Sequence, residues 1–283
     1  MTNAADLRLG DHVCLPFDTD DALRAHVAAF TAAGLDAGHR VMVFTPTSTV
    51  DAMTGWLRRH HRASTRALDT GQLQIHSPDD VHLAGGCFEP DRMMTGFAHA
   101  TEQAHADGYP GLRVTVDMSW ALQPVPGVEH LFDFEAKANR LFLDHRLAAV
   151  CAYDERRFSP AAINQACAAH PSTPGMATMR FTRPPRPGLN LSGEIDIGNR
   201  QALDGLLTTL PYADTTLDLT GVTFIDAGGA GALLHFAQAR GDRTTTIVAG
   251  PKVVRLLNLL DAATVAGLTV VAAKLSTQLQ ETP

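Results

Sequence analysis

Short apolar runs alternate with segments of helical spacing along most of this chain. Four apolar runs of strand length predict buried β-strands at 41–44, 73–76, 112–118 and 147–153. Apolar residues that recur every three or four positions predict helices at 20–34 or 20–38, 50–57, 92–105, 128–143 and 160–169. Nearly continuous apolar strands that alternate with helices are typical of a parallel sheet with helices on both faces.

The alternation resumes in the last third of the chain. Strands are predicted at 189–195, 216–219, 245–249 and 268–271. Helices are predicted at 199–210, 229–240 and 251–260. This order predicts a second, smaller α/β domain.

A proline-rich segment separates the two parts. Residues 171–188 hold five prolines and three arginines and lack periodicity throughout. Because proline removes a backbone donor and disfavours helix in the residue before it, Arg183 to Pro187 are predicted to form an extended spacer. The alternative for Ala177 to Phe181 is a strand that pairs with a sheet. The predicted domains are therefore 1–170 and 189–283, with a linker at 171–188.

Length and charge exclude several classes of protein. A chain of 283 residues is long enough for two domains. The net charge is −7 and neither domain is basic, so no nucleic-acid partner is predicted. There is neither a run of about 18 apolar residues nor a signal peptide at the start of the sequence. A cytoplasmic location without membrane attachment is therefore predicted.

Reactive side chains are concentrated in the first domain. All 4 cysteines and all but one of the 13 histidines precede residue 171. In a reducing compartment the cysteines are predicted to be free thiols, most of them small buried residues. They form no CxxC pair, so no metal site is predicted from their spacing.

The clearest motif lies in the second domain. The segment from Leu217 to Leu234, with Leu191 to Asp196 before it and Val248 to Pro251 after it, closely resembles the STAS family of anti-sigma factor antagonists. The resemblance runs from about 189 to 275. It implies a partner of the anti-sigma factor or serine-kinase type. The partner-binding residues that it implies are Asp226, Ala227, Gly228, Gly229 and Gly231.

One position departs from the STAS pattern. The family carries a phosphoacceptor serine or threonine in the motif Asp-Ser-Ser/Thr-Gly, and its phosphorylation breaks partner binding. Gly228 stands at that position here. A glycine cannot accept phosphate, so no phosphorylation site is predicted. The partner-binding surface at residues 226–231 is still predicted.

The first domain resembles the MEDS family of sensory domains. The residues that carry the resemblance are Gly10 to Cys14, Val116 to Trp120, Glu135, Cys151 to Asp154 with Arg157 and Phe158, and His170 with Pro171. The resemblance implies a RecA-like fold and a small, hydrocarbon-like ligand, and it identifies no cofactor. The RecA relationship raises the question of nucleotide chemistry. A P-loop needs GxxxxGK[ST], and the matching stretch from Phe44 to Val50 has neither glycine nor lysine, so enzymatic activity is not predicted.

A ligand pocket is predicted at the carboxyl ends of the parallel strands, where such sheets usually bind ligands. The candidate ligand-binding residues are His12, Cys14, Asp117, Trp120, Glu135 and Tyr153. Structural roles stay open for several of them. Cys14 and Trp120 suit a core, Asp117 suits a turn cap, and Glu135 suits a pairing with Arg140 or Arg113.

Together these patterns predict a cytoplasmic signalling regulator, in which a sensor domain controls a STAS output that lacks the usual phosphoacceptor. Two alternatives remain: a ligand-binding scaffold that forms homodimers without a sigma-factor role, and a RecA-like nucleotide-dependent enzyme.

Overall fold

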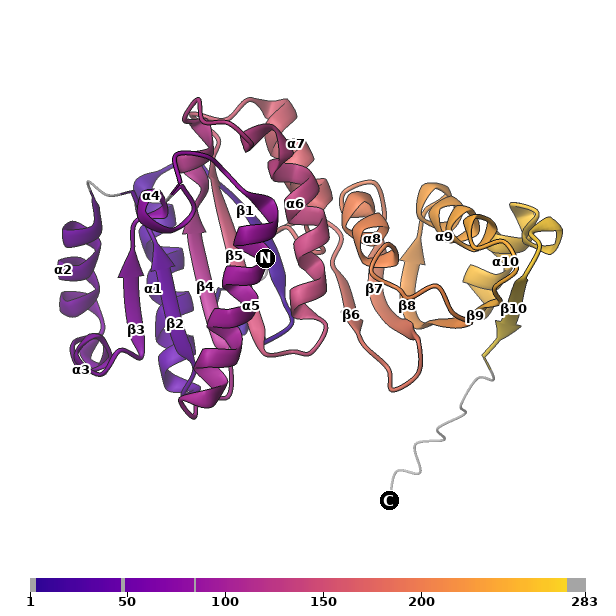
Figure 1. Ribbon diagram of the computed structural model, residues 1–283, viewed down its shortest axis with the longest axis horizontal. Coiled ribbons are helices and arrows are strands. Elements are labelled where there is room, and N and C mark those ends of the chain that lie inside the picture. The colour runs from indigo at the N-terminus through magenta and orange to yellow at the C-terminus, as the bar shows by residue number, and fades with distance from the viewer. Residues whose placement is uncertain (1–3, 47–48, 84, 274–283) are drawn as a thin grey trace, which may run out of the picture.

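The computed structural model describes residues 4–46, 49–83 and 85–273 of the chain. They form two sheets that follow one another along the long axis of the molecule (Figure 1). Thr47 and Ser48, within the stretch compared with a P-loop, lie outside the described residues, as does the end of the predicted second domain at 274–283.

The first sheet has five strands in the order β1-β5-β4-β2-β3, and every pair is parallel. The strands are β1 (His12–Phe17), β2 (Arg40–Phe44), β3 (Leu73–His76), β4 (Leu112–Asp117) and β5 (Leu147–Asp154). All eight residues of β5 are buried, as expected for a central strand covered on both faces. The predicted α/β class, with a parallel sheet covered by helices on both faces, is confirmed.

The sequence pattern missed β1. Its apolar residues are interrupted by His12 and Pro16, and no alternation or continuous apolar run marks it as a strand. It lies at the edge of the sheet, paired with β5 alone in that sheet, which is where a proline is tolerated.

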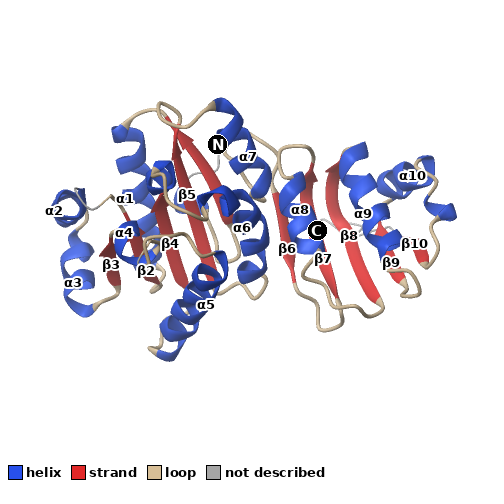
Figure 2. Ribbon diagram, turned by 45° about the horizontal axis from the view of Figure 1, so that its top comes forward, coloured by secondary structure: helices blue, strands red, loops and turns tan. Residues whose placement is uncertain are grey.

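Helices cover both faces of this sheet (Figure 2). Helix α1 (Asp20–Asp36) packs against β2 and β4 on one face, with α3 (Arg62–Thr70) beside it and α2 (Val50–His60) following at the β3 edge. The other face carries α5 (Pro90–Ala106), α6 (Leu131–Ala138) and α7 (Pro160–Ala169). The short helix α4 (Pro78–Val81) precedes α5. The long helix predicted at 128–143 is divided, because 3-10 turns at 128–130 and 139–142 flank α6.

The second sheet has the order β10-β9-β8-β7-β6, with β6 antiparallel to β7 and the other pairs parallel. Its strands are β6 (Met179–Thr182), β7 (Gly188–Ile195), β8 (Thr215–Ile225), β9 (Thr245–Ala249) and β10 (Leu268–Ala272). Its helices are α8 (Arg200–Leu207), α9 (Ala227–Ala239) and α10 (Pro251–Leu259). The small α/β domain predicted after the linker is confirmed.

The predicted linker, residues 171–188, is not an extended spacer, because part of it forms a strand of the second sheet. Met179 and Phe181 alternate inward on β6 and are buried, so this part of the segment belongs to the second sheet. Arg183 to Pro187 then connect β6 to β7 inside one sheet. The chain passes between the domains earlier, where Ser172 forms bridges to Val13 of β1 and to Thr178.

The two domains share one hydrophobic core through α8. This helix packs against α6 and α7 of the first domain (Figure 2). Leu203 and Leu206 of α8 are buried in the same cluster as Phe134 of α6. The approach is closest at Gly205, where a Cβ atom would overlap the backbone carbonyl oxygen of Ala136. Glycine is therefore required there by the helix–helix contact.

Within the described residues, none of the helices is both long enough and apolar enough to cross a lipid bilayer.

We expect Gly205→Ala to lower the free energy of unfolding by about 1–3 kcal/mol, because the added methyl group forces α8 away from α6. Gly96→Ala is the matched control: this helical glycine is exposed and open, and alanine there removes the helix penalty of glycine. Chemical denaturation of both variants makes the comparison. Equal stabilities would show that the α6–α8 contact does not constrain residue 205.

Candidate functional site

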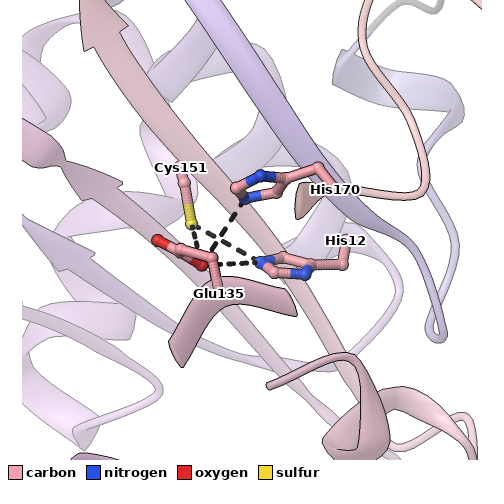
Figure 3. A group of neighbouring side chains, drawn as sticks. All are labelled: His12, Glu135, Cys151 and His170. Atoms are coloured by element: carbon pink, nitrogen blue, oxygen red, sulfur yellow. Dashed lines mark hydrogen bonds and ion pairs between the residues drawn. The ribbon is translucent and has the colours of Figure 1, made fainter. Parts of the chain in front are cut away.

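Four polar side chains meet between the first sheet and the helices that cover its second face (Figure 3). His12 begins β1, Cys151 lies within β5, Glu135 lies on α6, and His170 follows the last residue of α7. All four residues are buried. We refer to these four residues as the HECH cluster.

The side-chain nitrogen, oxygen and sulfur atoms of the HECH cluster lie close together. The Oε2 atom of Glu135 is 3.4 Å from Nε2 of His12 and 3.6 Å from Nε2 of His170. The Sγ atom of Cys151 is 3.6 Å from Nε2 of His12 and 3.8 Å from Oε2 of Glu135. One donor atom from each residue lies within 4.8 Å of the other three.

Strand register brings two members of the cluster together. Cys14 of β1 pairs with Cys151 of β5, so the side chains at positions 12 and 14 share a face with those at 151 and 153. Tyr153 therefore points into the same layer, where its hydroxyl donates to Oε1 of Glu135 at 3.2 Å. Cys14 lies beside the cluster, with its Sγ 3.8 Å from Sγ of Cys167.

A second layer of hydrogen bonds orients both imidazoles. Asn139 donates from Nδ2 to three backbone carbonyls, so its Oδ1 accepts from Nδ1 of His12 at 2.9 Å. Nδ1 of His170 donates to the carbonyl oxygen of Ala166 at 2.7 Å. With a proton on each Nδ1, both rings direct Nε2 toward Glu135.

Burial controls the charges in the cluster. It lowers the pKa of His170 to about 4, so this imidazole is neutral at pH 7. Burial, with help from Glu135, raises the pKa of the Cys151 thiol well above its usual value. Burial opposes ionisation of Glu135, but His170, His12 and Tyr153 outweigh it, and the pKa of Glu135 lies below its usual value. Glu135 is therefore an ionised carboxylate that lies beside the two imidazoles.

A small apolar cavity of about 40 Å³ adjoins the cluster. His12, Glu135 and Cys151 form part of its wall. The rest of the wall is formed by His82, Met93, Phe97, Val114, Val116, Met118, Trp120, Phe134, Ala138, Leu141, Phe142, Leu147 and Ala149. Both ring nitrogens of His82 and Nε1 of Trp120 are buried without a hydrogen-bond partner among the described residues. The cavity therefore combines apolar walls with unused polar groups, as ligand sites do.

The structure brings most of the predicted site residues together, at a place other than the predicted one. His12, Glu135 and Tyr153 meet in the cluster, Cys14 lies beside it, and Trp120 lines the cavity. His12 is at the start of its strand, so the group lies within the second face of the sheet and not at its carboxyl edge.

Asp117 lies apart from this group. It ends β4, and its Oδ1 accepts from the backbone N–H of Ser119 at 2.9 Å, so it caps the 3-10 turn Met118–Leu122. It also lines a separate cleft of about 530 Å³ at the carboxyl edge of the sheet. Three charged groups of that cleft pair with one another, since Arg156 bridges Asp154 at 2.8 Å and Asp20 at 2.6 Å.

The two pairings considered for Glu135 are not formed. Arg113 points to the opposite face of the sheet, where it donates to the carbonyl oxygen of Leu7 and to His39. Arg140 forms no ion pair with Glu135, whose ion pairs among the described residues are with the two histidines of the cluster.

Sequence reasoning missed two members of the cluster as site residues, Cys151 and His170. Both belong to the motifs that resemble the MEDS family. Their position gave a further signal, because a cysteine on a wholly apolar strand and a histidine directly after a helix both face a core.

The start of α9 forms the second candidate site. Asp226 caps this helix by accepting from the backbone N–H of Gly229 at 2.6 Å. Gly229 is buried, and a Cβ atom there would lie 2.8 Å from Cγ2 of Ile195. Ala227 is exposed and Gly231 has open space around it. Of the predicted partner-binding residues, Gly229 therefore has a packing role.

Gly228 faces an arginine of the neighbouring helix. A Cβ atom at this position would meet Nη1 of Arg200, the first residue of α8, 2.5 Å away. The guanidinium thus lies against the place where the STAS pattern has its phosphoacceptor. Two large apolar side chains that lie within a few residues of these helix starts in the sequence are exposed: Ile197 is 82% exposed and Phe224 is 51% exposed.

Comparisons with known proteins define the family of the chain. The model of the methanogen/methylotroph, DcmR sensory (MEDS) domain matches residues 11–171, more than half of the chain, and a model described as the Mlab, STAS domain matches residues 179–275. The protein belongs to the MEDS family and carries a STAS domain after the sensory domain. The comparison with curated proteins finds no match.

Two solved structures are similar to part of the chain. One is the flagellar accessory protein FlaH from Methanocaldococcus jannaschii, with 9% identity and a TM-score of 0.40 over 62% of this chain and 73% of that chain. The other is a KaiC-like protein from Pyrococcus horikoshii OT3, with 14% identity and a TM-score of 0.39 over 65% of this chain and 78% of that chain.

Acid should destabilise the protein through His82. Burial lowers the pKa of this histidine to about 4 from 6.5, so unfolding takes up a proton between these values. Stability from this group is present above pH 6.5 and is lost as the pH falls to 4, by about 3 kcal/mol. We expect His82→Phe to reduce the difference between unfolding free energies measured at pH 7 and pH 4.5.

His99→Phe, which replaces an exposed histidine, is the control and should leave the acid dependence unchanged. If both variants lose stability with acid as the unsubstituted protein does, His82 is not a source of the acid sensitivity.

Proposed function

We propose that this protein is a cytoplasmic signalling regulator whose first domain binds a small ligand beside the HECH cluster and whose STAS domain binds an anti-sigma factor of the serine-kinase type. The observation that carries the proposal is the position of α8. Through Gly205 this helix contacts the helix that bears Glu135, and through Arg200 it contacts the start of α9. One rigid element thus touches both candidate sites.

The sensory role rests on the cavity. It is mainly apolar and bounded by Trp120, His82 and three residues of the HECH cluster, which suits a small apolar molecule with one polar atom. A ligand acts on the output only if it binds one arrangement of α6 and α8 more tightly than another. Glu135 connects the cavity to α8. Its side chain forms part of the cavity wall, and the helix that carries it, α6, packs against α8.

The output role rests on the surface at the start of α9. Ile197, shortly before α8, and Phe224, at the end of β8 just before α9, both expose apolar side chains, while Ala227 and Gly231 in the first turns of α9 have a small side chain or none. Exposed apolar groups around an accessible backbone are suited to a protein partner. Because residue 228 is a glycine, we assign control of this surface to movement of α8 and not to phosphorylation at that position. No enzymatic step is part of the proposal.

A bulky residue in the open space at Gly231 should block partner binding without changing the fold. We expect Gly231→Arg to weaken the complex with a cognate anti-sigma kinase by at least roughly 30-fold, the cost of losing a central interface contact. Titration calorimetry with the purified kinases of the host organism measures the affinity.

Ala239→Arg, exposed at the far end of the same helix, is the matched control and should bind normally. Failure of the unsubstituted protein to bind any such kinase, together with concentration-dependent self-association in analytical ultracentrifugation, would favour the scaffold alternative.

A further inference from the structure

We propose that His12, Glu135, Cys151 and His170 bind one zinc ion in tetrahedral coordination. The site was not expected from cysteine spacing, because its ligands come from two strands, a helix and the residue after another helix. The inference concerns the sensory domain and stands independently of the STAS partner.

The separation of the donor atoms matches that of zinc ligands. Zinc–nitrogen and zinc–oxygen bonds of about 2.0–2.2 Å and zinc–sulfur bonds of about 2.3 Å place tetrahedral ligands about 3.3–3.7 Å apart. Four of the six donor pairs in the cluster are 3.4, 3.6, 3.6 and 3.8 Å apart, and all six lie within 4.8 Å. A zinc ion therefore fits between these atoms once the more distant donors move inward, by roughly 1 Å or less. Two imidazoles, a thiolate and a carboxylate form a ligand set of mixed softness that suits zinc.

The residues around the cluster already have the arrangement that metal sites use. Nδ1 of His12 donates to Oδ1 of Asn139, and Nδ1 of His170 donates to the carbonyl oxygen of Ala166. Both histidines therefore direct Nε2 toward the other ligands. Nε2 of His170 has no hydrogen-bond partner among the described residues. Tyr153 holds Oε1 of Glu135 and leaves Oε2 toward the centre. Such outer hydrogen bonds fix the tautomer and direction of metal ligands.

Charge gives an independent reason for a cation. Glu135 is only 2% exposed, and within the described part of the chain no arginine or lysine pairs with it. A buried carboxylate that lacks a permanently charged partner is costly. When zinc binds, the Cys151 thiol releases its proton to solvent, and the thiolate and carboxylate together balance the two charges of the ion.

The ion would lie at the polar end of the apolar cavity, because three of its four ligands form part of the cavity wall. This position gives a ligand in the cavity a metal as its neighbour, next to Trp120 and His82. The chemistry of the site therefore favours small molecules that carry a sulfur or nitrogen atom on an apolar body.

The test is metal binding by the full-length protein. Protein produced with zinc in the medium should retain one equivalent per chain after gel filtration, measured by elemental analysis and native mass spectrometry. Replacement of zinc by cobalt should produce the visible bands of a tetrahedral site and a near-ultraviolet thiolate-to-cobalt band. Zinc should also raise the melting temperature of the metal-free protein by roughly 5 °C or more at saturating concentration.

Two isosteric cysteine variants locate the thiolate. Cys151→Ser should remove the thiolate-to-cobalt band and weaken zinc binding at least about 100-fold. Cys14→Ser, which changes the buried residue paired with Cys151 on the next strand, should keep both. Tyr153→Phe should keep the tetrahedral spectrum and weaken zinc binding about 10-fold, since it removes only the hydrogen bond to Glu135.

Three outcomes overturn the proposal. In the first, the unsubstituted protein takes up neither zinc nor cobalt. In the second, Cys151→Ser keeps the thiolate-to-cobalt band. In the third, the band is lost in Cys14→Ser alone, which would place the metal at the Cys14–Cys167 pair. Because none of these measurements involves an anti-sigma kinase, they separate failure of the metal site from failure of the proposed STAS function.

Discussion

The buried carboxylate of Glu135 is the group on which the rest of the sensory domain depends. A charge that is only 2% exposed needs polar partners, and each of them comes from a different segment: His12 from the edge strand, Tyr153 from the central strand and His170 from the end of α7. Satisfying one carboxylate therefore fixes where α6 and α7 lie on the sheet. The apolar cavity beside them follows from the same constraint, since a polar cluster at its edge limits how far the surrounding aromatic side chains can close.

Helix α8 belongs to the STAS domain by sequence and to both domains by packing. Its buried leucines complete a core that is continuous with that of the sensory domain, and Gly205 lets it approach the backbone of α6. Two domains joined by a flexible tether move independently, but domains that share a core change arrangement together. Under the proposed mechanism, a movement of Glu135 would reach Arg200 at the other end of α8 without any intermediate loop.

Local sequence patterns predicted the central strands, the flanking helices and the division into two α/β units, because those features depend on runs and periods within one segment. They failed for β1, whose His12 and Pro16 hide its strand character. The site was predicted in part. His12 and Glu135 were candidates, but His12 and Cys151 are 139 positions apart, and only the register of β1 on β5 brings them together. The general rule for parallel sheets pointed to the carboxyl edge, where the structure places Asp117 in a cleft apart from the cluster.

The glycine at position 228 also determines how a signal in this protein would end. A phosphorylated serine stays phosphorylated after the stimulus has gone, until a phosphatase removes the phosphate. Gly228 has no side-chain oxygen that could carry a phosphate, and Arg200 lies against the position where a side chain would start. Under the proposed mechanism, an output that follows α8 therefore returns to its starting state when the ligand dissociates, without a chemical step at residue 228.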